Sequence, residues 1–180
     1  MKSNVDKEIF ELENRGSLLD LIENIVLFNY ARKENLRELD KTLRESYCND
    51  LRDFRSQFNI IYESILNKEL SGFFEYMRDI LILFDRLIGK IEHSFYGYTP
   101  IFERKKKINV NELRIILNHD KDLNSNVEEL KLIIEQAYEE SENEDFEKVK
   151  NQIKKLRKKM IALERKWNER ERLFMPFNNK

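Results

Sequence analysis

The chain has 180 residues, of which 41% are hydrophobic and 37% charged, and its acidic and basic side chains nearly cancel to a formal net charge of −1. This balance excludes a general electrostatic affinity for nucleic acid or for an anionic membrane. Four glycines and two prolines are too few for a turn-rich β-sandwich. We therefore expect one all-helical domain over residues 1–180, a length that can bury a substantial core.

The first thirty residues predict two helices that Gly16 separates. The second helix, Leu18 to Tyr30, is apolar on more than one face and is expected to lie deep in the core. The stretch from Leu36 to Ile65 is strictly amphipathic and predicts one helix about 45 Å long. Such a length favours an elongated bundle.

A helix from Phe73 to His93 follows a break at Asn67 to Gly72. It is the most apolar helix of the set and is predicted to form the centre of the core. The residues expected in that core are Phe73, Phe74, Met77, Ile80, Leu81, Phe84 and Leu87.

Residues 94–108 form the one long irregular stretch. Two capping-box patterns follow, Asn109 with Glu112 and Ser125 with Glu128, and each predicts the start of a separate short helix. The first is expected to end near His119.

The terminal segment, about residues 145–174, carries a heptad stripe typical of a coiled coil, and Pro176 is expected to end its helix. The aromatic residues of the stripe are uneven in size, which favours packing inside its own chain, chiefly against the Leu36 to Ile65 helix. Arg170 would put a charge in this seam, and its long stem could carry that charge to solvent. The end beyond Trp167 is a candidate to project and meet a partner. The stripe consists of Phe146, Val149, Ile153, Leu156, Met160, Leu163 and Trp167, continued by Arg170 and Phe174.

The fold class that these patterns predict is all-α. We expect an elongated helical bundle of about five to seven helices, two of them long and amphipathic, with the C-terminal one heptad-patterned.

The single cysteine, Cys48, excludes an internal disulfide and a cysteine-rich zinc site. Its helical, partly apolar surroundings favour a buried structural residue over a reactive thiol. No apolar run reaches the ~18–20 residues of a membrane span, and Met1 to Asp6 does not resemble a signal peptide. We expect a cytoplasmic protein with no membrane span, no metal and no cofactor.

The two histidines have different interpretations. His93 ends an apolar helix, where a surface or capping role suffices. His119 follows Arg114 by five positions, and this Arg-x4-His spacing resembles that of HEPN ribonucleases, small helical domains that dimerise and cleave RNA. The resemblance implies metal-independent catalysis in which His119 shuttles a proton and Arg114 holds phosphate charge. In those motifs a polar residue usually follows the Arg, whereas Ile115 follows it here.

A second resemblance covers about fifty residues. The helix Phe73-Phe74-Glu75-Tyr76-Met77-Arg78-Asp79-Ile80-Leu81-Ile82-Leu83-Phe84-Asp85, with the later Tyr98, Ile101, Phe102, Glu112, Leu113 and Asn118, is similar to phage abortive-infection (AbiC-like) helical proteins. The resemblance implies a role in prokaryotic antiphage defence.

Two groups of basic residues have open interpretations. Arg104, Lys105, Lys106 and Lys107 lie near Tyr96 and Tyr98, a combination that suits single-stranded RNA but also a solvated loop. On the terminal helix, the basic residues could meet phosphates, although the water-facing side of a helix is the expectation. They are Lys154, Lys155, Arg157, Lys158 and Lys159.

Two functions follow from the sequence. The first is a non-catalytic interaction or scaffold protein in antiphage defence, which binds a protein partner or a second copy of itself through helical surfaces. The alternative is a HEPN-like ribonuclease or toxin that uses Arg114 and His119 and has RNA as its partner.

Overall fold

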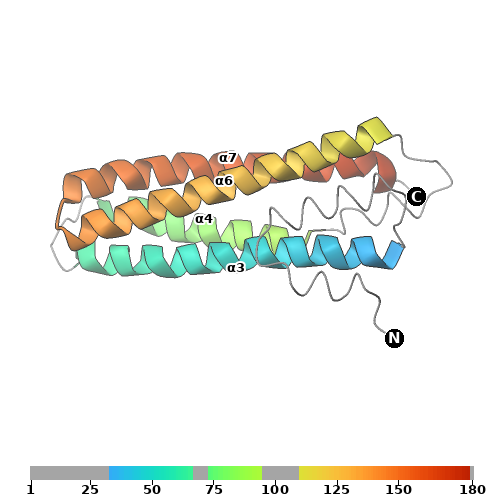
Figure 1. Ribbon diagram of the computed structural model, residues 1–180. Coiled ribbons are helices and arrows are strands. Elements are labelled where there is room, and N and C mark those ends of the chain that lie inside the picture. The colour runs from blue at the N-terminus through green and yellow to red at the C-terminus, as the bar shows by residue number, and fades with distance from the viewer. Residues whose placement is uncertain (1–32, 67–72, 95–109, 179–180) are drawn as a thin grey trace. The chain divides into compact units, whose positions relative to one another are not determined.

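The computed structural model describes residues 33–66, 73–94 and 110–178, with side chains for 40–66, 73–94 and 115–173. These residues form four α-helices and no strand: α3 (Lys33–Leu66), α4 (Phe74–Glu92), α6 (Val110–Glu142) and α7 (Phe146–Asn178) (Figure 1). The all-α prediction is confirmed for this part of the chain. The helices predicted before residue 31, and the break at 67–72, lie outside the described residues.

The bounds of α3, α4 and α7 agree with the predicted helices to within a few residues. The end of α7 is an exception, because the helix continues through Pro176 to Asn178. Beyond the first turn of a helix, proline removes one backbone hydrogen bond and crowds the carbonyl four residues earlier, so Pro176 weakens the last turn of α7 without ending the helix. None of the described helices is long and apolar enough to cross a membrane.

The prediction of two short helices after residue 109 was wrong. A single helix, α6, runs from Val110 to Glu142 and includes Ser125, where the second helix was expected to begin. The core-facing stripe continues through this point, since Leu123, Val127 and Leu130 are all buried. Burial of a continuous apolar face stabilises one long helix by more than a local capping pattern stabilises a new helix start at Ser125.

The chain divides into two compact units. Of the described residues, the first unit comprises 33–46, 94, 110–124 and 166–178, and the second comprises 47–66, 73–93 and 125–165. Three helices, α3, α6 and α7, contribute a segment to each unit, whereas α4 belongs to the second unit alone.

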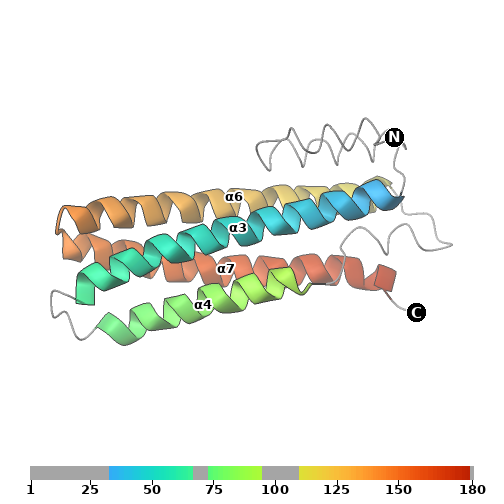
Figure 2. The same cartoon turned by 90° about the horizontal axis from the view of Figure 1, so that it is seen from below.

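In the second unit, four helical segments form a bundle in which α3 and α7 are diagonal (Figures 1 and 2). Ion pairs join α3 to α4, through Arg55 and Asp85 at 2.6 Å, and α4 to α7, through Arg86 and Glu164 at 2.6 Å. Lys159 pairs with Glu129 between α7 and α6. The hydroxyls of Ser64 on α3 and Ser141 on α6 are 2.6 Å apart.

Most of the terminal heptad stripe packs inside its own chain, as predicted, whereas Phe146 is half-buried and the side chain of Phe174 lies outside the described part. Val149, Ile153, Leu156, Met160, Leu163, Trp167 and Arg170 are buried. The prediction named α3 as its chief neighbour; in the second unit the polar contacts of α7 go to α4 and α6, whereas in the first unit Arg170 of α7 pairs with Asp40 of α3. The sequence pattern gives which face of a helix is buried but not which helix covers it.

The core of the second unit is apolar. The residues of α4 that line it include Met77, Ile80, Phe84 and Leu87, as predicted, whereas Phe73, Phe74 and Leu81 are only half-buried. The ring centroids of Phe58 and Phe84 are 6.0 Å apart. Cys48 is buried and its thiol donates to the Ile88 carbonyl at 3.8 Å, which agrees with a structural role.

A tight turn of the second unit connects α6 to α7. The Asp145 N–H donates to the Glu140 carbonyl at 3.0 Å, and the Glu144 N–H donates to the Ser141 carbonyl at 3.1 Å. This pair of bonds is the Schellman motif, which requires a left-handed residue at the position after the cap. Glu144 occupies that position with φ of 57°, although glycine is the residue that adopts it without strain. Asp145 then accepts a bond from the Lys148 N–H at 3.3 Å and caps α7.

Candidate functional site

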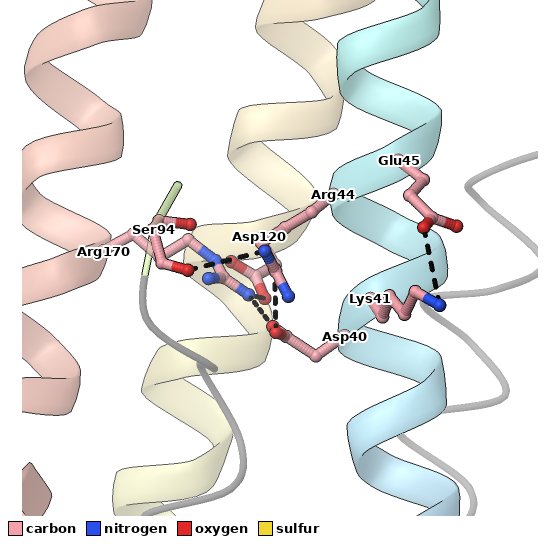
Figure 3. Close-up of polar contacts among 7 residues, drawn as sticks. All are labelled: Asp40, Lys41, Arg44, Glu45, Ser94, Asp120 and Arg170. Atoms are coloured by element: carbon pink, nitrogen blue, oxygen red, sulfur yellow. Dashed lines mark hydrogen bonds and ion pairs between the residues drawn. The ribbon is translucent and has the colours of Figure 1, made fainter. Parts of the chain in front are cut away.

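Four charged side chains lie buried together in the first unit. Asp40 and Arg44 come from consecutive turns of α3, Asp120 from α6 and Arg170 from α7 (Figure 3). Asp40 and Asp120 are 0% exposed, Arg170 is 1% exposed and Arg44 is 8% exposed. We call these four residues the buried charge cluster. Charged side chains are almost never so buried unless they are paired.

Arg170 lies at the centre of the cluster and contacts both carboxylates. Its Nε donates to Asp120 Oδ1 at 2.7 Å and its Nη2 to Asp120 Oδ2 at 3.2 Å, a two-pronged pairing. The same Nη2 donates to Asp40 Oδ1 at 2.8 Å. The guanidinium also lies 5.0 Å from the centre of the Trp167 ring, within the range of a cation–π contact. One arginine therefore ties α7 to both α3 and α6.

Arg44 completes the cluster from the α3 side. Its Nε donates to Asp40 Oδ2 at 3.1 Å, and its Nη1 donates to the Ser94 carbonyl at 3.4 Å. Figure 3 shows the exposed pair Lys41 and Glu45 on another side of α3, directed away from the cluster. Because the two pairs face different sides of α3, the Lys41–Glu45 pair is solvated whereas the Asp40–Arg44 pair is buried.

The cluster balances its own charge, because two carboxylates face two guanidinium groups. Taking an ion out of water costs several kcal/mol, and only close pairing with good geometry offsets that cost. The expectation that the Arg170 stem would carry its charge to solvent was wrong. Its carboxylate partners lie 50 and 130 residues away in the sequence, and they make the buried position tolerable.

His119 lies next to the cluster on α6. Its side chain is 16% exposed, and its Nε2 is 3.9 Å from a carboxylate oxygen of Glu169. Neither ring nitrogen has a hydrogen-bond partner within the described residues. Burial lowers the pKa of His119 below its usual value of 6.5, and Arg170 lowers it further, while Asp120 and Glu169 oppose these effects. The imidazole is therefore mainly neutral at pH 7.

Arg114 and His119 lie on one continuous helix, α6. Positions five apart on an α-helix are about 140° apart around its axis. The side chain of Arg114 lies outside the described part, as do Arg104, Lys105, Lys106 and Lys107. Arg170, the arginine that influences the His119 pKa, is buried and bound to two carboxylates, so it is not available to a phosphate.

The other predicted positions are on the surface. His93 is exposed at the C-terminal end of α4, as the surface interpretation predicted, and its backbone N–H donates to the Gly89 carbonyl at 3.0 Å. Lys154, Lys155 and Lys158 are exposed on α7, whereas Arg157 and Lys159 are half-buried. Across the described ranges, no group of three His, Cys, Asp or Glu side chains could hold a metal ion.

Sequence reasoning missed Asp40, Arg44 and Asp120. A signal for them was present, since Asp40, Asp120 and Arg170 each occupy a core-facing position in the helical spacing of their own segment. A charge at such a position in three separate helices indicates mutual pairing, because each alone would be too costly to bury.

Comparison of the chain with protein-family models, with curated proteins and with solved structures gave no match.

Proposed function

We propose that this chain is a non-catalytic helical protein that acts through protein contacts in prokaryotic antiphage defence. The observation that best supports the first part is the buried charge cluster. Its charged groups, which a catalytic site would turn toward a substrate, are instead paired with one another at 0–8% exposure. The defence role is supported by the resemblance to abortive-infection proteins alone.

The helical surfaces offer large apolar side chains for such contacts. In the second unit, Ile82 on α4, Leu132 on α6 and Ile161 on α7 are 55%, 57% and 45% exposed. Single exposed apolar residues are common on protein surfaces. Here charged residues surround them, which resembles the apolar centre and polar rim of a protein interface.

The alternative is a HEPN-like ribonuclease that uses Arg114 and His119. One observation favours it: a mainly neutral histidine whose ring nitrogens have no partner in the described structure could accept a proton. In this alternative, Arg114 must reach the RNA phosphate at which His119 acts, from a position about 140° away from His119 around the axis of α6.

Two assays separate these functions. Purified wild type and the Arg114→Ala, His119→Ala double variant are incubated with structured and with unstructured RNA, and the products are resolved on gels. The proposed function predicts equal background for both proteins, and cleavage by the wild type alone supports the ribonuclease. Both proteins are then produced in a bacterial host that is challenged with phages. The proposal predicts equal protection, and the absence of protection by the wild type contradicts the defence role.

A further inference from the structure

The outer faces of α6 and α7 in the second unit carry opposite charges. On α6, Glu128, Leu132, Glu135 and Glu139 are exposed and recur at spacings of four, three and four residues. On α7, Lys154, Lys158, Ile161 and Arg165 are exposed at the same spacings. Residues at such spacings lie on one side of a helix. We call these the acidic stripe and the basic stripe.

In the second unit, polar contacts between α6 and α7 of one chain join Lys159 to Glu129, and Gln152 to Gln136 and to Glu140. None of these five residues belongs to a stripe. Among the described residues, the side chains of Lys154, Lys158, Arg165 and Glu139 have no ion-pair or hydrogen-bond partner. Glu135 has only a 4.0 Å contact with Lys131, both half-exposed, a kind of pair that contributes little to stability.

The two stripes match each other in one orientation. When two helices run antiparallel with Leu132 opposite Ile161, Glu135 lies opposite Lys158, Glu139 opposite Lys154 and Glu128 opposite Arg165. The apolar side chains meet between the ion pairs, and both are about half exposed, at 57% and 45%. A parallel arrangement through the same two residues instead places Glu135 opposite Glu164 and Lys154 opposite Ser125.

We infer that this chain associates with a second copy of itself by pairing the acidic stripe of one copy, antiparallel, with the basic stripe of the other. The pairing closes as a twofold dimer when both stripes of one copy meet the same neighbour, and it continues as a ring or filament when they meet different neighbours. The inference rests on the proposed function in one respect, since both assign the activity to exposed helical surfaces.

Charge reversal and sedimentation velocity test the inference. Wild type should show association that grows with protein concentration and weakens as ionic strength rises from about 0.05 M to about 0.5 M, because salt screens exposed charges. Reversal of the acidic stripe (Glu135→Lys, Glu139→Lys) should lower the association constant at least about tenfold. Reversal of the basic stripe (Lys154→Glu, Lys158→Glu) should do the same. A matched control, Asp53→Lys with Asp79→Lys, changes the charge equally at exposed positions of α3 and α4 and should leave association unchanged.

The decisive sample is an equal mixture of the two reversed variants. Each alone carries two stripes of like sign, but in the mixture every stripe has an opposite partner, so association should return. A wild type that stays monomeric at its highest soluble concentration would overturn the inference, as would association that both reversals leave intact. Circular dichroism verifies that each variant folds. These failures would concern this surface alone, because the RNA and phage assays test the proposed function independently.

Discussion

The two units of this chain differ in what their helices bury. The second unit has an apolar core, with Phe58, Phe84 and Leu156 all 0% exposed, and its ion pairs lie at the surface. In the first unit, the stripes of the same helices carry Asp40, Asp120 and Arg170 at core-facing positions. Apolar contacts are non-directional, whereas a buried ion pair is tolerated only in one geometry. We therefore infer that the charged positions favour one pairing of the helices, while the apolar positions supply most of the burial.

The largest effect is expected from removal of the central arginine. Arg170→Met keeps much of the side-chain volume but removes one of the two positive charges of the cluster. The carboxylates of Asp40 and Asp120 then face Arg44 as the remaining cation of the cluster. Loss of one partner of a buried pair costs about 3–5 kcal/mol. Urea unfolding measures this change. Arg172→Met, at an exposed position of the same helix, is the control and should change stability by less than about 0.5 kcal/mol.

The apolar core can be tested along three successive aliphatic residues of α4. Ile80 is fully buried, Leu81 is half-buried and Ile82 is 55% exposed. Ile80→Ala should lower the free energy of unfolding by about 2–5 kcal/mol through lost burial and a cavity. Leu81→Ala should cost less, and Ile82→Ala should stay within about 0.5 kcal/mol. Equal costs at the three positions would contradict the assigned face of α4.

Glycine at position 144 should stabilise the second unit. Glu144 has a φ of 57° in the turn between α6 and α7, where a side chain is strained and glycine is not. Glu144→Gly is therefore expected to raise the free energy of unfolding by up to about 1 kcal/mol. Glu142→Gly, within α6, is the control and should be destabilising. Thermal unfolding followed by circular dichroism compares the two variants, and destabilisation by both would argue against the left-handed turn.

The smallest effect concerns pH. The pKa of His119 is lowered by burial, so the folded state binds a proton less readily than the unfolded state. The stability that the neutral His119 contributes is therefore fully present above pH 6.5, the pKa of the unfolded state. It is lost as pH falls from 6.5 toward the lower pKa of the folded state. Unfolding curves between pH 5 and pH 7.5 should show this slope in the wild type and less of it in His119→Gln. An unchanged slope in the variant would assign the pH dependence to other groups.

Periodicity was sufficient to predict the course of α3, α4 and α7, because the burial of one face leaves a repeating pattern in the sequence. It failed where the deciding partner is remote. Ser125 resembles a helix start, yet the buried stripe around Leu123 and Val127 keeps α6 continuous. Likewise, the core-facing position of Arg170 was visible in the sequence, but its partners were not, since Asp40 and Asp120 come close to it only after folding. For the candidate site, the sequence located His119 but not the cluster beside it.

The most direct test of the buried charge cluster is a double-mutant cycle on Asp120 and Arg170. The free energies of unfolding are measured for wild type, Asp120→Asn, Arg170→Met and the double variant. If the two side chains are bound to each other in a buried site, the double variant should lose less stability than the sum of the single losses. The expected coupling is about 1–3 kcal/mol. Additive losses, with a coupling below about 0.5 kcal/mol, would contradict the pairing on which this account of the first unit depends.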